Sequence, residues 1–213
     1  MEDIMKILAI NGSHRKGKNT ALMLQAVLDE AARAGAETEL VELVDYNIKP
    51  CLACNRCLGK TECSIKDDDM GVLAEKMLAA DGIVLGSPVY WANVTGLMKN
   101  FIDRTRWMHM AKNMLHGKVG GAVTHAGLRN GGQEHALAIM ERFLVAQGLI
   151  LVDTRDQGSG ISNCGAMGTM FNSLDEGKIS WKRSVHEDLL ALEECRRLGR
   201  NMVHMIKRLV PGT

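Results

Sequence analysis

The feature that most restricts the fold of this chain is a regular alternation of short apolar runs with segments of helical periodicity. Each apolar run leans toward β-branched residues and ends in a loop, and a segment with helical spacing follows it. This alternation predicts an α/β fold in which helices cover both faces of a parallel sheet. The expected strands span residues 4–10, 37–43, 82–86, 118–124 and, more weakly, 149–153. The expected helices span residues 20–34, 69–80, 94–106, 133–147 and about 184–209.

Five parallel strands with right-handed crossovers fit a doubly wound sheet of order 2-1-3-4-5. This order predicts a ligand crevice at the carboxyl ends of the first and third strands. An aspartate within residues 67–69 is expected to cap the second helix, and Gly35 and Gly148 are expected to end helices. Three stretches show neither periodicity, namely residues 45–66, 107–116 and 157–180.

Size and charge restrict the class of protein. A chain of 213 residues is expected to build one core, so residues 1–213 are predicted to form a single domain. A net charge of +1 provides no long-range field for nucleic acid or an anionic membrane, and neither is expected as a partner. No apolar run approaches the roughly 20 residues that span a bilayer, and the N-terminus lacks a cleavage-type flank. A cytoplasmic location is therefore expected.

The loop after the first strand, residues 11–20, combines two glycines with hydroxyl and basic side chains and opens directly onto a helix. Backbone N–H groups at a helix start favour a phosphate dianion, and Ser13, Asn19 and Thr20 can donate further hydrogen bonds. The loop matches neither a Walker A motif nor Gly-x-Gly-x-x-Gly. The alternative is a solvated turn whose polar residues only cap the helix.

Two further loops are expected at the same edge of the sheet. Residues 86–93 include Tyr90 and Trp91, whose flat apolar surface suits a ring system such as isoalloxazine, although core packing of one of them is an alternative. Residues 124–134 are rich in glycine, which lets backbone amides approach a flat ligand closely. Three loops are thus predicted to converge on one crevice.

Cysteine spacing is the sharpest local signal. Cys51, Cys54, Cys57 and Cys63 lie within thirteen residues, a compactness that lets one loop surround an iron–sulfur cubane. Zinc and redox-active thiols are alternatives, but structural zinc sites usually join two separated pairs. The remaining Cys164 and Cys195, and the histidines His109, His116 and His125, lack ligand-type spacing and are not expected to bind metal.

The three loops together resemble those of the flavodoxin-like NAD(P)H-dependent FMN reductase superfamily. The resemblance spans about residues 4–153 and includes Gly12-Ser13-x-Arg15 with Asn19-Thr20, residues 87–91, residues 96–104 and residues 124–134. It implies that the FMN phosphate is held by Ser13, Arg15, Asn19 and Thr20. It also implies that the flavin ring is bordered by Pro88, Val89, Tyr90, Trp91 and Asn93, and contacted by Thr124 and Gly127. His14 and Lys18 depart from the superfamily's usual residues.

With a cysteine motif inserted after the second strand, the chain resembles the iron–sulfur flavoproteins. This resemblance implies that Cys51, Cys54, Cys57 and Cys63 bind a [4Fe–4S] cluster that exchanges electrons with FMN. It also implies a homodimer or homotetramer served by a ferredoxin-type or small-molecule donor such as NAD(P)H. Two alternatives are an NAD(P)H-dependent FMN or quinone reductase without a cluster, and a non-enzymatic flavin redox sensor. No side chain is expected to act as a covalent catalyst.

Overall fold

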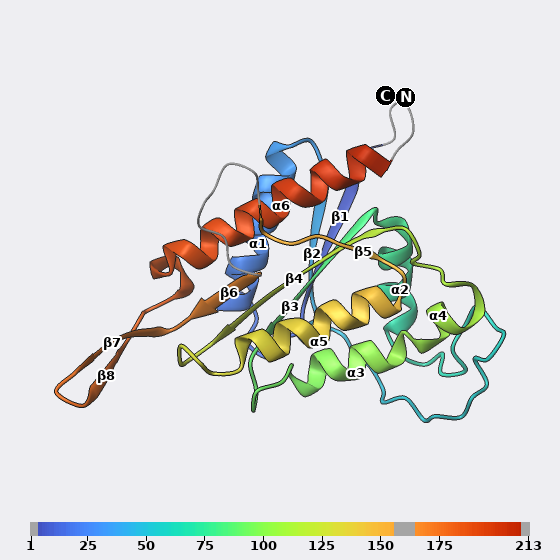
Figure 1. Ribbon diagram of the computed structural model, residues 1–213. Helices are drawn as coiled ribbons and strands as arrows, with labels where there is room; N and C mark the ends of the chain where they lie inside the picture. The colour runs from blue at the N-terminus through green and yellow to red at the C-terminus, as the bar shows by residue number, and fades with distance from the viewer. Residues whose placement is uncertain (1–3, 156–164, 210–213) are drawn as a thin grey trace.

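The computed structural model describes residues 4–155 and 165–209 and contains the expected parallel sheet (Figure 1). Its order is β2-β1-β3-β4-β5, which confirms the flavodoxin-like prediction. The long strands are β1 (Lys6–Asn11), β2 (Glu37–Glu42), β3 (Gly82–Pro88) and β4 (Val119–Ala126). All neighbours in this order pair in parallel.

The edge of the sheet beyond β4 differs from the five-stranded expectation. β5 (Ile150–Leu151) pairs only with the start of β4, and β6 (Ala166–Thr169) pairs in parallel with its last residues. In the described part of the chain the sheet therefore has six strands, with two short ones sharing the fifth position. The sequence did not indicate β6, because four residues are too few to show strand alternation.

Alternating side chains along the strands divide the core into two layers. Ile7 and Ala9 face α1 (Asn19–Arg33) and α6 (Leu189–Leu209). Leu8 and Ile10 face the opposite layer, which holds the remaining long helices. That layer comprises α2 (Met70–Ala79), α3 (Gly96–Arg104) and α5 (Gln133–Ala146). Figure 1 shows α1 and α6 on one side of the strands and α2, α3 and α5 on the other.

The predicted helix of residues 94–106 is two helices. Thr105 interrupts it, and α4 (Arg106–Lys112) follows, so the prediction of an unpatterned 107–116 was wrong over most of that stretch. The Thr105 hydroxyl donates to the carbonyl of Ile102 at 2.8 Å and accepts from the Gln147 amide at 2.8 Å. A helix of seven residues spans too few turns to show a clear apolar period.

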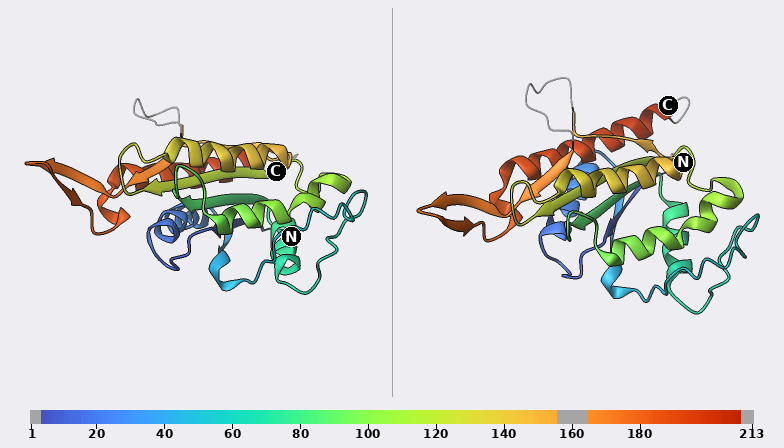
Figure 2. Two further views of the ribbon diagram at one scale, coloured as in Figure 1. Left: turned by 90° about the horizontal axis from the view of Figure 1, so that it is seen from below. Right: turned by 60° about the horizontal axis from the view of Figure 1, so that its bottom comes forward.

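The C-terminal third also departs from the sequence prediction. Within the stretch 157–180 predicted to lack pattern, the part from residue 165 onward forms β6, β7 (Phe171–Asp175) and the first residues of β8 (Lys178–Trp181), while residues 157–164 lie outside the described part. β7 and β8 make an antiparallel hairpin that projects from the sheet (Figure 2). The expected C-terminal helix begins at Leu189 rather than near residue 184, because a separate 3-10 turn, η2 (Val185–Glu187), precedes it.

Several expected helix ends are confirmed. Gly35 and Gly148 have φ of +99° and +83°, the left-handed geometry that glycine adopts readily at a helix end. Asp68 accepts the N–H of Met70, the first residue of α2, at 3.2 Å. Another 3-10 turn, η1 (Leu43–Asp45), follows β2. Among the described helices, none is both long enough and apolar enough to cross a membrane.

Candidate functional site

Three loops meet at the carboxyl ends of β1, β3 and β4, where they enclose a cavity of about 230 Å³. The N–H of Gly12 donates to the carbonyl of Gly86 at 2.8 Å, which ties the first loop to β3. The N–H of Val89 donates to the carbonyl of His125 at 2.8 Å, which ties the second loop to β4. The cavity is lined by Ser13, Arg15, Lys18, Asn19, Pro88, Val89, Tyr90, His125, Ala126, Gly127 and Met170.

The buried carboxylate of Glu42, the last residue of β2, holds the first loop in place through two hydrogen bonds. Glu42 accepts from the Asn11 side-chain amide at 2.6 Å and from the N–H of Gly17 at 3.0 Å. Within the loop, the N–H of Ser13 donates to Asn11 and that of Arg15 donates to the Ser13 hydroxyl. Helix α1 has no side-chain cap, so its first N–H groups remain available to an anion at this cavity.

The second loop is fixed by Thr95, the N-cap of α3. Its hydroxyl accepts from the N–H of Met98 at 3.0 Å and donates to the carbonyl of Gly12 at 2.5 Å. Its own N–H donates to the Ser87 hydroxyl at 3.1 Å. Thr95 is completely buried, and it therefore joins the start of α3 to both the first and the second loop.

His125 is the titratable group most strongly affected by the cavity. Its Nε2 lies 3.1 Å from the Thr20 hydroxyl, and its buried Nδ1 has no hydrogen-bond partner among the described residues. Burial, and secondarily the charge of Arg15, lowers the pKa of His125 to about 4. The imidazole is therefore neutral at physiological pH.

Seven residues expected around FMN line this cavity, and four do not. Ser13, Arg15, Asn19, Pro88, Val89, Tyr90 and Gly127 line it. Thr20 is turned to His125, and the buried Thr124 hydroxyl donates to the carbonyl of Ser87 at 2.7 Å. Trp91 is fully exposed, and the Asn93 side chain accepts from the N–H of Val94 within its own loop.

Four lining residues were missed in the sequence. Lys18 lies in a predicted loop, and His125 and Ala126, which the prediction placed in the loop 124–134, are the last residues of β4. Their place at strand ends was the available signal. Met170 gave no signal, because its segment lacks periodicity. It reaches the cavity because β6 pairs with β4, and its sulfur accepts from the Asn19 amide at 3.0 Å.

The segment that carries the four cysteines, residues 46–69, is here called the cysteine loop; it connects η1 to α2 and lies beside α3 and α4 (Figure 1). Cys51 and Cys54 are exposed, Cys57 and Cys63 are half-buried, and all four thiols are free. Cys57 and Cys63 pack against the core, and the Cys54 sulfur lies 3.3 Å from the Ser64 hydroxyl. This hydrogen bond, with a backbone hydrogen bond and the charge of Arg56, lowers the pKa of Cys54. In residues 4–155 and 165–209, no three His, Cys, Asp or Glu side chains are grouped so as to hold a metal ion.

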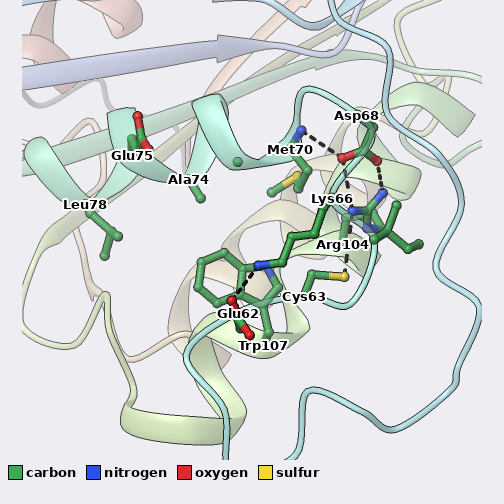
Figure 3. A pocket seen from close by; sticks show the side chains of 12 residues that line it. Glu62, Cys63, Lys66, Asp68, Met70, Ala74, Glu75, Leu78, Arg104 and Trp107 are labelled. Carbon is green, nitrogen blue, oxygen red and sulfur yellow. Dashed lines mark hydrogen bonds and ion pairs between the residues drawn. The ribbon is translucent and has the colours of Figure 1, made fainter.

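A buried ion pair joins the cysteine loop to the end of α3. Figure 3 shows Arg104, at the end of α3, between Asp68 and Cys63. Arg104 makes a two-pronged ion pair with Asp68, and both side chains are about 1% exposed. Burial alone would lower the pKa of Arg104, but the hydrogen bonds and charge of Asp68 outweigh it and raise that pKa.

Comparison with known proteins identifies the family. The model of the NADPH-dependent FMN reductase family matches residues 5–155. An iron–sulfur flavoprotein of Archaeoglobus fulgidus is 40% identical over 94% of this chain and 95% of its own length. An iron–sulfur flavoprotein of Methanocaldococcus jannaschii is 35% identical over 95% of this chain and 98% of its own.

The chain belongs to the iron–sulfur flavoproteins of the FMN reductase family. Membership in this family makes it an FMN-dependent oxidoreductase, as its sequence predicted. The fold has a structural counterpart in RosB, solved with 8-demethyl-8-formylriboflavin-5'-phosphate. The TM-score is 0.74 at 16% identity, covering 96% of this chain and 80% of RosB.

Proposed function

We propose that this iron–sulfur flavoprotein transfers electrons between FMN, held at the carboxyl ends of β1, β3 and β4, and a [4Fe–4S] cluster held by the cysteine loop. The observation that carries the proposal is the loop itself. Four free cysteines lie along thirteen residues, beside two buried N–H donors that have no acceptor among the described residues. These donors, Nε of Arg104 and Nε1 of Trp107, line one cavity with Cys63.

The chemical types of the donors present suit both groups, while the four thiols are not gathered around one point in the described residues. Cys51, Cys54, Cys57 and Cys63 supply the four thiolates that a cubane requires, and sulfur acceptors would satisfy the unpaired donors. In the flavin cavity, Ser13, Arg15 and Lys18 surround uncapped helix N–H groups, a donor set suited to a phosphate dianion. Pro88, Val89, Tyr90 and Gly127 provide the apolar and backbone surface proposed for the ring.

The other predicted flavin residues receive supporting roles in this proposal. Asn19 fastens the loop to the C-terminal segment, since its amide donates to Met170 and its oxygen accepts the N–H of Val185. Thr20 is held by His125, and Thr124 fixes β4 against β3. Trp91 and Asn93 belong to the exposed turn at the cavity mouth, and we propose that they contact the ring from there.

FMN accepts two electrons and a [4Fe–4S] cluster passes them singly, so together they connect hydride or two-electron reagents with one-electron carriers. The protein's own side chains set the conditions for this exchange. Neutral His125 keeps an additional positive charge out of the cavity, while Arg15 and Lys18 provide charge at its entrance. None of these side chains needs to form a covalent bond.

The two sites lie at opposite ends of α3, because Thr95 caps its start against Gly12 and Arg104 at its end contacts Cys63. Eight helical steps between Gly96 and Arg104 separate them by about 12 Å along the axis. We propose that a homodimer or homotetramer shortens this path by bringing one protomer's cysteine loop toward its partner's flavin cavity. We further propose a ferredoxin-type or nicotinamide donor and a cytoplasmic location, the latter supported by the free thiols.

The first experiment is anaerobic purification followed by absorption spectroscopy and analysis of iron, sulfide and zinc. Flavin with about four iron and four sulfide per chain would support the proposal. Flavin with zinc or without metal would refute the cluster and favour an NAD(P)H-dependent reductase. C57S should lose iron and sulfide but retain flavin, whereas the matched control C195S, which changes a fully buried cysteine of α6, should retain both.

A further inference from the structure

The buried guanidinium of Arg104 fastens the cysteine loop to the end of α3. Among the described residues, Arg104 is the largest side chain that is fully buried. Its Nη1 donates to Asp68 and to the carbonyl of Lys49, the latter at 2.6 Å, and its Nη2 donates to the second oxygen of Asp68 at 3.3 Å. Since a buried charge is costly without its partner, neither side chain can leave without the other.

These contacts join the two ends of the cysteine loop, here called its stems. Lys49 lies two residues before Cys51, and Asp68 lies five residues after Cys63. Asp68 also accepts the N–H of Lys49 at 3.0 Å, so the two stems are joined directly as well as through Arg104. Between the stems most residues are exposed, and the position of the thiols therefore depends on this anchor.

Arg104 also contacts one of the thiols. Its Nη2 lies 3.7 Å from the sulfur of Cys63, within reach of a hydrogen bond to sulfur. Its Nε and the Nε1 of Trp107, three residues further along, are buried without partners in the described part of the chain. All three residues line one cavity of about 190 Å³, shown in Figure 3. Arg104 and Trp107 therefore present N–H donors to the Cys63 side of the loop, while the Arg104 charge is paired with Asp68.

We propose that Arg104, held by Asp68, is a positioning residue that orients Cys63 and raises the reduction potential of the cluster. The inference rests on the proposed function. Reduction adds negative charge to an iron–sulfur cluster, and N–H groups that donate hydrogen bonds to its sulfurs stabilise that form. Arginine suits this position because its planar fork can serve a carboxylate, a carbonyl and a thiolate together, which the single ammonium of lysine cannot.

The test compares R104K and the double variant R104Q/D68N with the wild type in an anaerobic, EPR-monitored redox titration. R104Q/D68N removes the ion pair as a unit, so the net charge beside the loop is unchanged while the guanidinium N–H donors are lost. We expect its one-electron reduction equilibrium to shift about tenfold toward the oxidised cluster, about 59 mV. R104K keeps one ammonium as a donor beside Asp68 and should shift less. The matched control R106Q removes a half-buried arginine that contacts Asn55 of the same loop at 2.8 Å, and it should leave the potential unchanged.

A second readout does not need the cluster. In the apoprotein, tryptic cleavage after Arg56 and Lys60 should be about tenfold faster in R104K and R104Q/D68N than in the wild type or R106Q, because the loop stems are loosened. Flavin content would show that each variant is folded. Wild-type potentials and cleavage rates in both Arg104 variants, with full iron and sulfide, would overturn this inference alone. A wild type without iron and sulfide would overturn the proposed function and this inference together.

Discussion

Replacing Thr95 with valine should destabilise the protein out of proportion to the size of the change. Valine has nearly the shape of threonine, so the substitution removes only the hydroxyl that caps α3 and binds Gly12. Loss of an N-cap costs about 1 kcal/mol, and a buried carbonyl left without its partner costs about 1–3 kcal/mol. Because Thr95 and Gly12 are both buried, water cannot replace the bond, and we expect T95V to lose about 2–4 kcal/mol of unfolding free energy.

The assay is urea unfolding of the apoprotein, followed by FMN titration of the folded variant. The control T95S keeps the hydroxyl and should stay within about 1.5 kcal/mol of the wild type, since it loses one methyl group. Loosening one residue of the first loop adds about 1–2 kcal/mol of ordering cost on binding, so the Kd of T95V for FMN should rise about tenfold. A T95V protein as stable as T95S would refute the assigned role of the hydroxyl.

Three further predictions test the cavity and the packing. R15Q should weaken FMN binding by about 10–100-fold but leave riboflavin binding unchanged in calorimetry, because a charge-assisted bond to phosphate is worth about 1.5–3 kcal/mol; equal losses for both ligands would contradict a phosphate role. The apoprotein should lose up to about 3 kcal/mol of unfolding free energy as pH falls from 6.5 to 4. Over this range His125 takes up a proton in the unfolded chain but stays neutral in the native state, so protonation favours unfolding. H125Q should flatten this pH dependence of the unfolding free energy. G199A should lower the melting temperature, since its Cβ would lie 2.3 Å from the backbone oxygen of Val27. The control G71A, whose Cβ meets nothing within 4 Å, should be neutral or slightly stabilising. Equal melting temperatures of the two variants would contradict this packing.

The cavity shows where sequence reasoning succeeds. Ser13, Arg15 and Tyr90 could be placed there because strand ends follow from apolar runs, and the ends of neighbouring parallel strands meet at one edge of a sheet. Thr124 was predicted at the start of the third loop, yet it lies within β4 and its hydroxyl donates to the carbonyl of Ser87. Sequence locates a side chain along the chain, but its direction depends on the bonds that neighbouring strands offer.

Elements defined by distant partners could not be predicted. β6 is a strand because β4 leaves its last residues unpaired beyond β5, and only that pairing carries Met170 to the cavity. α4 is separated from α3 at Thr105, which is engaged by Gln147 of a different segment. Such contacts join residues far apart in the chain and leave no local period.

The sequence by itself determined the alternating fold, the strand order, the loops that carry the chemistry and the compact spacing of the four cysteines, because hydrophobic period and residue spacing are properties of short segments. The tertiary structure alone decided that Thr95 and Arg104 connect the two ends of α3 to the two sites. It also decided that His125 stays neutral and that Arg104 is buried beside Cys63. Burial and charge pairing depend on which distant segments surround a group, and those neighbours exist only in the folded chain.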